Sequence, residues 1–434
     1  MTRTQVLVIG AGPAGIAAAA AAAENGRSVI VLDDNPAAGG QIWRESSVQR
    51  HRSDPRKRRA LERLQRSGAR IHIARSVFSA DPSGTVQALH ESAGSSVVEQ
   101  YRFDHLILAT GAREHFLPFP GWTLPGVFGA GGLQALVRGG YLVRGKRIVV
   151  AGTGPLLLAV AAHLEQDGAP IAAVLEQASL AQLAPFASSL LSNPARLLQG
   201  ARYRVRLWNT RYRTGCWVVE AIPDSTHEKL AAVRVTNGRR TWTEPCDLLA
   251  CGYHLVPNTE IASLLGCAFN GSFVRVDECQ RTSLPNVFCV GEPTGIAGLE
   301  GALVQGEIGG LECAGSSSAR LQKQAAAARR FAQALKAAFV LRDELRSLPR
   351  PDTIVCRCED VPFARLRSRS GWTDAKLQTR CGMGPCQSRI CGPAVEYLLG
   401  WKPVSIRPPL FPVPFQALCS PAEIDTTEHT QENA

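Results

Sequence analysis

Short, unbroken apolar runs alternate with a helical pattern at the start of the chain. Val6–Ile9 and Val29–Leu32 contain only Val, Ile and Leu, which is typical of strands buried in a parallel sheet. The alanine-rich segment between them opens at Pro13 and closes at Asn25-Gly26, so the pattern predicts a helix there. The order of these elements predicts a β-α-β unit.

The turn between the first strand and the helix carries a glycine motif, Gly10-Ala11-Gly12-Pro13-Ala14-Gly15. Gly10 permits a tight turn, Gly12 lets the backbone approach a pyrophosphate, and Gly15 lets the helix pack closely on the strand. An acid at the end of the second strand, Asp33, accepts hydroxyl groups of a ribose. The complete unit predicts a dinucleotide site, and its candidate residues are Gly10, Gly12, Pro13, Ala14, Gly15, Asp33 and Asp34.

The same pattern recurs once, further along the chain. The strand that ends at Ala151 leads into Gly152-Thr153-Gly154-Pro155-Leu156-Leu157, an apolar helix follows, and the next strand ends at Glu176. Leu157 stands where the third glycine belongs, so we expect the helix to be pushed off the strand and the phosphates to have less room. Gly152, Gly154 and Glu176 are candidates for holding NAD or another adenine nucleotide; the alternative is a structural Rossmann-type unit that binds nothing.

Two such units in one chain resemble a flavoprotein of the glutathione-reductase type, and three further segments fit that resemblance. Gly39-Gly40-Gln41 resembles the glycine pair that contacts the flavin, and Leu106–Ala112 resembles the strand by which the chain leaves the flavin domain. Pro285–Glu292 resembles the late strand whose terminal acid binds the ribityl chain. The resemblance implies further FAD contacts from Gly40, Gln41, Thr110, Gly111, Gly291 and Glu292.

Five of the 13 cysteines fall between Cys356 and Cys391. Four thiolates can hold zinc or a [2Fe–2S] cluster, and the number of ligands alone does not separate the two. The spacing resembles a small ferredoxin-like domain related to bacterioferritin-associated ferredoxin. That resemblance implies a [2Fe–2S] cluster and leaves Cys381 as a spare thiol of open role; the implied ligands are Cys356, Cys358, Cys386 and Cys391.

Composition and charge narrow the class of protein. The length of 434 residues allows two to four domains, and 45% hydrophobic and 20% charged residues are typical of a globular chain. The net charge of +11 is scattered, and we interpret its densest run, Arg56–Arg59, as an exposed helix face, so we expect no nucleic-acid partner. No apolar run is long enough to span a membrane. We expect a cytoplasmic protein, at most peripheral on the inner face of the membrane.

Three segments together resemble the α subunits of bacterial heteromeric amino-acid dehydrogenases: Val29–Arg44, Gly111–Trp122 and Gly291–Gly295. This group includes opine oxidases, proline and D-hydroxyproline dehydrogenases, and the B component of hydrogen cyanide synthase; the sarcosine oxidase α subunit is more distant. The resemblance implies an oxidoreductase subunit that relays electrons through FAD and the cluster. A flavin-bearing β subunit would oxidise the amino acid or amine, and a small [2Fe–2S] subunit is a further expected partner.

The predicted fold class is α/β, with two Rossmann-like dinucleotide-binding domains and a small C-terminal ferredoxin-like [2Fe–2S] domain. Pro349-Arg350-Pro351 breaks a long helical pattern from Ala319 to Leu348. The expected organisation is a discontinuous FAD domain, a second nucleotide-binding domain, a helical connector, the [2Fe–2S] domain and a Pro-rich tail, at residues 1–117 with 253–316, 118–252, 317–350, 351–400 and 401–434.

Two other functions stay open. A stand-alone NADH-dependent ferredoxin-type reductase would use the second site for hydride delivery, although Leu157 weighs against it. A non-catalytic scaffold would use its cofactors only to hold subunits together. No catalytic residue is predicted, since His115 and His163 are expected to be core residues. The apolar, Pro-rich segment Arg407–Phe415 should lie either on a partner or on its own flavin domain.

Overall fold

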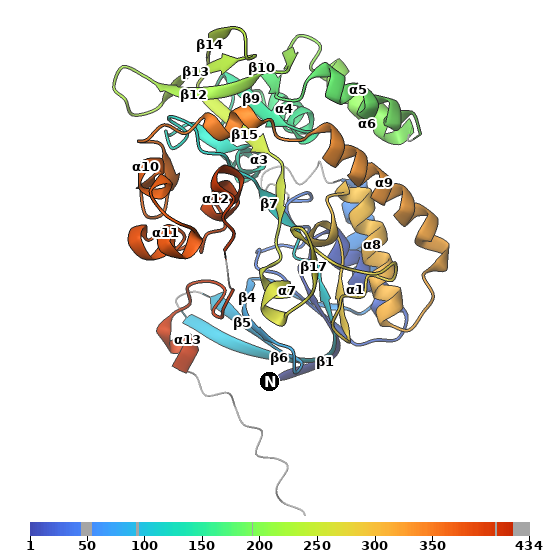
Figure 1. Cartoon of the computed structure of the whole chain (residues 1–434). Helices are drawn as coiled ribbons and strands as arrows, with labels where there is room; N and C mark the ends of the chain where they lie inside the picture. The colour runs from blue at the N-terminus through green and yellow to red at the C-terminus, as the bar shows by residue number, and fades with distance from the viewer. Residues whose placement is uncertain (45–53, 93–94, 193, 404–405, 420–434) are drawn as a thin grey trace, which may run out of the picture.

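The computed structural model describes residues 1–44, 54–92, 95–192, 194–403 and 406–419. Figure 1 shows two lobes, each built on a sheet, with the C-terminal helices beside them. The first lobe has a seven-stranded sheet in the order β3-β2-β1-β6-β5-β4, and β19 also pairs with β6. Strands β1–β3, β6 and β19 run parallel, while the pairs β6–β5 and β5–β4 are antiparallel. The strands are β1 (Thr2–Ile9), β2 (Val29–Leu32), β3 (Arg70–His72), β4 (Arg75–Asp81), β5 (Thr85–Ser92), β6 (Ser95–Leu108) and β19 (Val287–Cys289).

Small residues bring two helices of the first lobe into close contact. α1 (Pro13–Glu24) is rich in alanine, and α8 (Gly298–Cys313) faces it with glycines. A Cβ on Gly306 would lie 2.2 Å from the Ala14 carbonyl oxygen, and one on Gly310 would lie 2.2 Å from that of Ala18. Larger side chains at these positions would force the helices apart.

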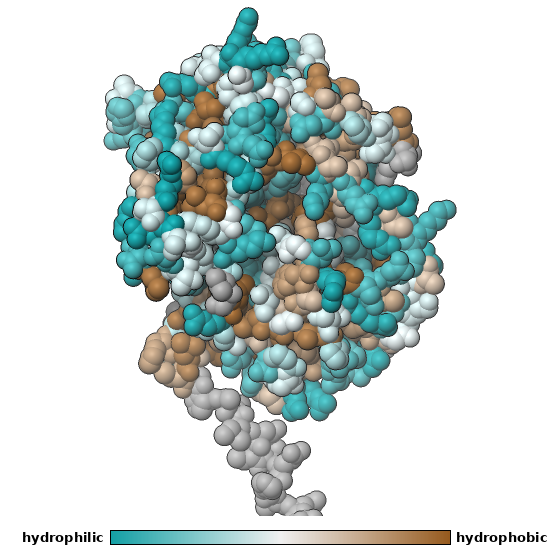
Figure 2. All heavy atoms as spheres, viewed as in Figure 1, coloured by the Kyte–Doolittle hydropathy of each residue, from teal (hydrophilic) through white to brown (hydrophobic). Residues whose placement is uncertain are grey.

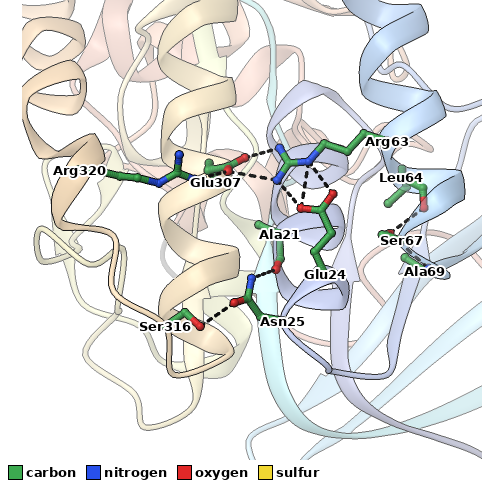
Figure 3. Close-up of polar contacts among 10 residues, drawn as sticks. All are labelled: Ala21, Glu24, Asn25, Arg63, Leu64, Ser67, Ala69, Glu307, Ser316 and Arg320. Carbon is green, nitrogen blue, oxygen red and sulfur yellow. Dashed lines mark hydrogen bonds and ion pairs between the residues drawn. The ribbon is translucent and has the colours of Figure 1, made fainter.

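Ion pairs connect α2 (Pro55–Arg66) to both of these helices, as Figure 3 shows. Arg63 contacts Glu24 of α1 at 2.6 Å, and its guanidinium also donates to Glu307 of α8 at 3.1 Å. Arg320 joins the same Glu307 at 3.2 Å. One member of the predicted exposed run departs from expectation, because Lys57 is buried and donates to the Trp43 carbonyl at 2.8 Å.

The second lobe confirms the second Rossmann-like unit. Its five-stranded sheet has the order β11-β10-β9-β15-β8 and is parallel throughout, with a three-stranded antiparallel sheet, β12-β13-β14, beside it. Its helices are α3 (Ala130–Arg138), α4 (Leu156–Gln166), α5 (Leu180–Ser189) and α6 (Pro194–Arg206). Its strands are β8 (Val127–Gly129), β9 (Ile148–Thr153), β10 (Ile171–Glu176), β11 (Arg211–Thr214), β12 (Trp217–Pro223), β13 (Leu230–Thr236), β14 (Thr241–Pro245) and β15 (Leu248–Tyr253).

Two short antiparallel strands connect the lobes, β7 (Ala112–Glu114) and β16 (Leu255–Pro257). α7 (Glu260–Leu265) follows β16, and a small hairpin, β17 (Phe269–Asn270) with β18 (Phe273–Val274), comes next. The first passage of the chain into the second lobe and its return to the first therefore run through one narrow ladder.

The predicted helix over 319–348 is shorter in the structure, where α9 (Gln322–Ala338) is followed by a 3₁₀ turn, Asp343–Ser347. The helix ends because Phe339 turns into the second lobe, where its ring packs 5.2 Å from that of Phe186. The Val340 carbonyl accepts a hydrogen bond from Gln177 at 3.0 Å. Tertiary contacts thus outweigh the local helical pattern.

The cysteine module is the part of the chain from β20 to α12. Its elements are β20 (Ile354–Cys356), β21 (Val361–Pro362), α10 (Phe363–Arg367), α11 (Trp372–Thr379) and α12 (Cys391–Leu399). The tail then returns to the first lobe, where Leu410 is 4% exposed and its amide donates to the Phe78 carbonyl at 2.8 Å. The described part of the tail, which ends in α13 (Phe415–Cys419), therefore packs on its own chain. Among the described residues, no helix is both long and apolar enough to cross a membrane.

Candidate functional site

One continuous cavity of about 3260 Å³ runs between the two lobes. Gly12 and Thr110 of the first lobe, Gly154 of the second and Ser388 of the cysteine module all line it. Figure 2 shows this face of the molecule hollowed near its centre, with apolar side chains inside the hollow. The structure thus places both glycine motifs and the cysteine module around one space.

The first glycine loop has the geometry that a dinucleotide requires. Gly10 has a φ of +106°, and a Cβ there would lie 2.3 Å from the Ala109 carbonyl oxygen. A Cβ on Gly15 would lie 1.8 Å from the Gly10 oxygen, so this position must be glycine for α1 to pack on β1. At Gly12 the nearest atom to a Cβ is 3.9 Å away, which leaves open space beside the start of α1. A pyrophosphate fits this space and would meet the helix N-terminus.

Asp33, the acid that follows β2, is held in place by hydrogen bonds, one of them from the glycine loop. Asp33 is buried, and its carboxylate accepts hydrogen bonds from the Ala11 amide at 2.5 Å and the Asn35 amide at 2.8 Å. Asp34 also lines the cavity, together with Gly40 and Gln41. Burial, with the neighbouring charge of Asp33, raises the pKa of Asp34. Pro13 and Ala14 line the cavity as well, so the predicted residues of this motif are assembled around it apart from Gly15, which packs behind.

Of the later flavin-contact candidates, Glu292 lines the same cavity, whereas Gly291 packs against the first glycine motif. Gly291 has a φ of +78°, and a Cβ there would lie 2.8 Å from the Ala14 side chain. Glu292 lines the cavity, and burial raises its pKa to about 7. None of the described residues donates a hydrogen bond to its carboxylate, which leaves an acceptor turned toward the cavity. Such an acceptor fits the hydroxyl groups of a ribityl chain.

Thr110 and Gly111 are held by a residue that sequence patterns did not single out. The Asn258 side-chain amide donates to the Thr110 carbonyl at 2.8 Å, and the Thr110 hydroxyl donates to the Asn258 carbonyl at 2.5 Å. The Asn258 backbone amide donates to the Gly111 carbonyl at 3.0 Å. Asn258 is far from Thr110 in sequence, so only the pairing of β7 with β16 brings them together.

The second glycine loop differs from the first at the acid and at the helix start. Glu176 is 1% exposed and accepts hydrogen bonds from the Thr153 hydroxyl at 2.7 Å and the Gly154 amide at 2.8 Å, and burial raises its pKa to about 6. A Cβ on Gly152 would lie 1.9 Å from the Gly252 oxygen, whereas Gly154 faces open space. α4 begins at Leu156, one position later in its motif than α1 does.

Five thiols gather in the cysteine module. Cys356, Cys381 and Cys391 are buried, and their sulfur atoms lie within 4.8 Å of one another. Hydrogen bonds from the thiols of Cys381 and Cys391 lower the pKa of Cys356 to about 2. Cys358 and Cys386 are more exposed and are hydrogen-bonded to each other.

A second cavity, of about 420 Å³, separates this module from the second lobe. Its lining contains no carboxylate, and Phe116 and Trp122 supply apolar walls. All four predicted ligands line it and Cys381 does not; the four are Cys356, Cys358, Cys386 and Cys391. A thiol-only donor set beside an apolar space fits a metal centre of the zinc or iron–sulfur kind. The group of close sulfur atoms contains Cys381 with Cys356 and Cys391, whereas Cys358 and Cys386 are not part of it, so the predicted ligand set stays a prediction.

No described cysteine lines the cavity that holds the first glycine loop, so the structure places no thiol pair beside the flavin site. Cys246 and Cys251 are buried in the second lobe, and burial raises the pKa of both thiols, to about 12 for Cys246. Burial also lowers the pKa of His115 to about 4, which keeps its ring neutral. The burial of His115 agrees with its expected place in the core.

Comparison with known proteins extends this picture. Residues 4–316 match the family model described as pyridine nucleotide-disulphide oxidoreductase. Hydrogen cyanide synthase subunit HcnB of Pseudomonas protegens is 32% identical over 98% of this chain and 99% of its own length. The A component of opine oxidase from Rhizobium meliloti is 32% identical over 95% of this chain and 98% of its own.

Among solved structures, L-proline dehydrogenase from P. horikoshii shares the fold, with a TM-score of 0.65 at 18% identity over 96% of this chain and 79% of that one. The two Rossmann-like lobes and the expected relatives are thus confirmed. The chain belongs to the pyridine nucleotide-disulphide oxidoreductase family, in the group that contains HcnB and the A component of opine oxidase.

Proposed function

We propose that this chain is the electron-transferring flavoprotein subunit of a heteromeric amino-acid or amine dehydrogenase. FAD is held by the first glycine loop, and a [2Fe–2S] cluster by Cys356, Cys358, Cys386 and Cys391. When bound, FAD supplies a two-electron acceptor and the cluster a one-electron carrier. A flavin-bearing β subunit oxidises an opine, proline, hydroxyproline or glycine-type substrate, and a small [2Fe–2S] subunit joins them.

One observation carries this proposal: the flavin cradle and the cysteine module border the same cavity. Gly382 and Ser388, from the loop that holds the thiols, line it together with Gly12 and Glu292. No described cysteine lines this cavity, so dithiol chemistry beside the flavin has no residue to perform it, and four thiols of the module line the second cavity, where they could hold a one-electron carrier. HcnB and the A component of opine oxidase are, by their names, subunits of larger enzymes, which supports a partner-dependent activity.

The decisive assay measures dye reduction by proline, hydroxyproline, sarcosine, glycine and opines. The purified chain alone should reduce no dye with any of them, whereas the chain purified with its co-encoded subunits should turn over at least one. Turnover by the lone chain at the rate of the complex would contradict the proposal. Fast flavin bleaching by NADH would instead favour the reductase, and cofactors that stay oxidised during turnover would favour the scaffold.

The ligand set is tested by a pair of matched serine variants. Cys386→Ser should abolish the rhombic electron paramagnetic resonance signal of the reduced protein, because it removes one of four ligands. Cys381→Ser should keep the signal, since this thiol lies outside the second cavity. The reverse result would move Cys381 into the ligand set. Iron and acid-labile sulfide, each at two per chain, distinguish the cluster from zinc.

The second glycine loop is proposed to hold NAD or another adenine nucleotide without turning it over. Support comes from the open space at Gly154 and from the cavity that reaches Tyr203 and Phe331 beyond it. Release of bound nucleotide by denaturation, followed by mass spectrometry, identifies the occupant. A chain that releases FAD alone would favour the structural alternative.

A further inference from the structure

A partly buried charge cluster joins the first lobe to the cysteine module. Arg113, on β7, contacts Glu260 at 2.8 Å, and Arg389, between Cys386 and Cys391, approaches the same carboxylate to 3.8 Å. The three side chains are only 21%, 19% and 17% exposed for Arg113, Glu260 and Arg389. Two guanidinium groups thus share one carboxylate, which leaves one net positive charge in a poorly solvated place.

Hydrogen bonds extend this cluster from the flavin cradle to a predicted cluster ligand. Asn258, which holds Thr110 at the edge of the cavity, accepts a hydrogen bond from the Arg113 guanidinium at 2.7 Å. The same guanidinium donates to the Arg389 backbone carbonyl at 3.1 Å. Arg389 in turn donates to the Cys386 carbonyl at 3.3 Å. Four consecutive contacts therefore span the distance from Thr110 to Cys386.

Arg389 also holds the tail in place. Its guanidinium donates to the Leu410 carbonyl at 3.1 Å and lies 4.1 Å from the centre of the Phe411 ring. Leu410 is itself held in the first lobe, because its backbone amide donates a hydrogen bond to the Phe78 carbonyl. One side chain thus contacts the cysteine loop, the tail and an acid of the first lobe.

From these contacts, and resting on the proposed function, we infer that Arg389 is a positioning residue for electron transfer. It holds the thiol loop on the flavin lobe and keeps a positive charge beside the cluster, paired with Arg113 through Glu260. A nearby positive charge stabilises the reduced cluster, which carries one more negative charge than the oxidised one, and therefore raises the reduction potential. Because these side chains are partly buried, the effect of the charge is screened less than that of a surface arginine.

The test compares three variants of the cofactor-loaded complex. Arg389→Gln should make the cluster harder to reduce, by about tenfold in the equilibrium constant or ~59 mV for a one-electron couple. Arg389→Lys keeps the charge and should restore most of the potential. Arg380→Gln is the matched control, because Arg380 also adjoins a cysteine but is 65% exposed and paired with Glu359 at 2.7 Å. The reduction potential of the cluster in Arg380→Gln should equal that of the wild type, as measured by redox titration of the paramagnetic signal.

Hydrogen exchange supplies a readout that does not need the cluster. Exchange at the Leu410 amide should accelerate in Arg389→Gln and stay unchanged in Arg380→Gln, because only Arg389 contacts the tail. An unchanged potential in Arg389→Gln, or an equal shift in Arg380→Gln, would overturn the inference. A wild-type chain without iron and sulfide would instead contradict the proposed function, while the exchange measurement would still test the contact itself.

Discussion

Gly12 and Gly15 lie in one loop but must be glycine for different reasons. A side chain at Gly15 would collide with the Gly10 carbonyl, whereas one at Gly12 would enter open space beside α1. Gly12→Val should therefore fold and lose FAD, because its side chain takes the place of the pyrophosphate. Gly15→Val should lower the melting temperature whether or not flavin is present. Flavin absorbance per chain and thermal unfolding check both, and a folded Gly12→Val chain with a full complement of FAD would refute the assignment.

The raised pKa of Glu292 predicts that the stability of the flavin-free chain depends on pH. Its pKa of about 7 in the folded chain lies above the ordinary 4.5, so the folded state keeps a proton that the unfolded state releases between these values. The free energy of unfolding should therefore fall as the pH rises through this window. Above pH 7, Glu292→Gln should be more stable than the wild type by about 1–3 kcal/mol.

Denaturant unfolding at pH 5 and pH 8, without flavin, measures this difference between Glu292→Gln and the wild type. Saturation with FAD should shrink it, because ribityl hydroxyl groups would donate to the charged carboxylate. If the free energy of unfolding changes equally with pH in flavin-free Glu292→Gln and in the flavin-free wild type, Glu292 does not titrate in this range.

The residues foreseeable from sequence are those whose role is local. Gly10 and Gly15 are set by backbone geometry within a few positions, so their motif suffices to find them. Asn258, Arg113 and Glu260 have partners from distant parts of the chain, and no spacing rule connects them. Their roles depend on how β7 and β16 pair, which the sequence alone did not reveal.

At the scale of elements, Arg63 is the contact that fixes α2 on α1 and α8. Its partners Glu24 and Glu307 are 39% and 15% exposed, so the network is only partly shielded from water. Arg63→Ala should lower the free energy of unfolding by about 1 kcal/mol, with a smaller effect at high salt. Urea unfolding checks this. Arg66→Ala is the control, since Arg66 is 78% exposed and approaches Glu62 only to 3.9 Å; an equal loss there would argue against a specific role for the network.

Elements with a strong internal pattern were predictable, and those shaped by neighbours were not. The apolar runs around Val6 and Val29 are strands, because short runs of β-branched and apolar residues suit a parallel sheet that is buried on both faces. The helical pattern beyond Ala338 gave way because Phe339 gains a buried site among aromatic rings of the second lobe. Local propensity is weaker than such burial, and a sequence pattern contains no information about a distant pocket.

At the scale of the whole molecule, the tail is part of the first lobe. Leu410 is 4% exposed in a core that includes Leu7 and Val77, so its removal leaves a cavity. Leu410→Ala should lower the free energy of unfolding by about 2–4 kcal/mol. Leu418→Ala, at a side chain that is 54% exposed, should have almost no effect. Chemical denaturation of both variants checks this, and equal stabilities would place the tail outside the folding unit.

The order of lobes could be predicted from the repeated glycine motif, whereas the shared cavity could not. Each motif implies its own nucleotide site, but neither contains information about how the lobes face each other. The position of the tail was likewise open, because a Pro-rich apolar segment packs equally well on a partner and on its own chain.

The first sheet closes with a strand from late in the chain. β19 and α8 complete the lobe that β1 and α1 begin, while the whole second lobe is encoded between them. During synthesis, the first glycine loop therefore leaves the ribosome long before β19 and α8. Until α8 is made, the alanine-rich face of α1 has no helix to pack against. A nascent chain arrested before Val287 should not retain flavin, and one released beyond Cys313 should. Loading of the cofactor thus follows synthesis of the second lobe.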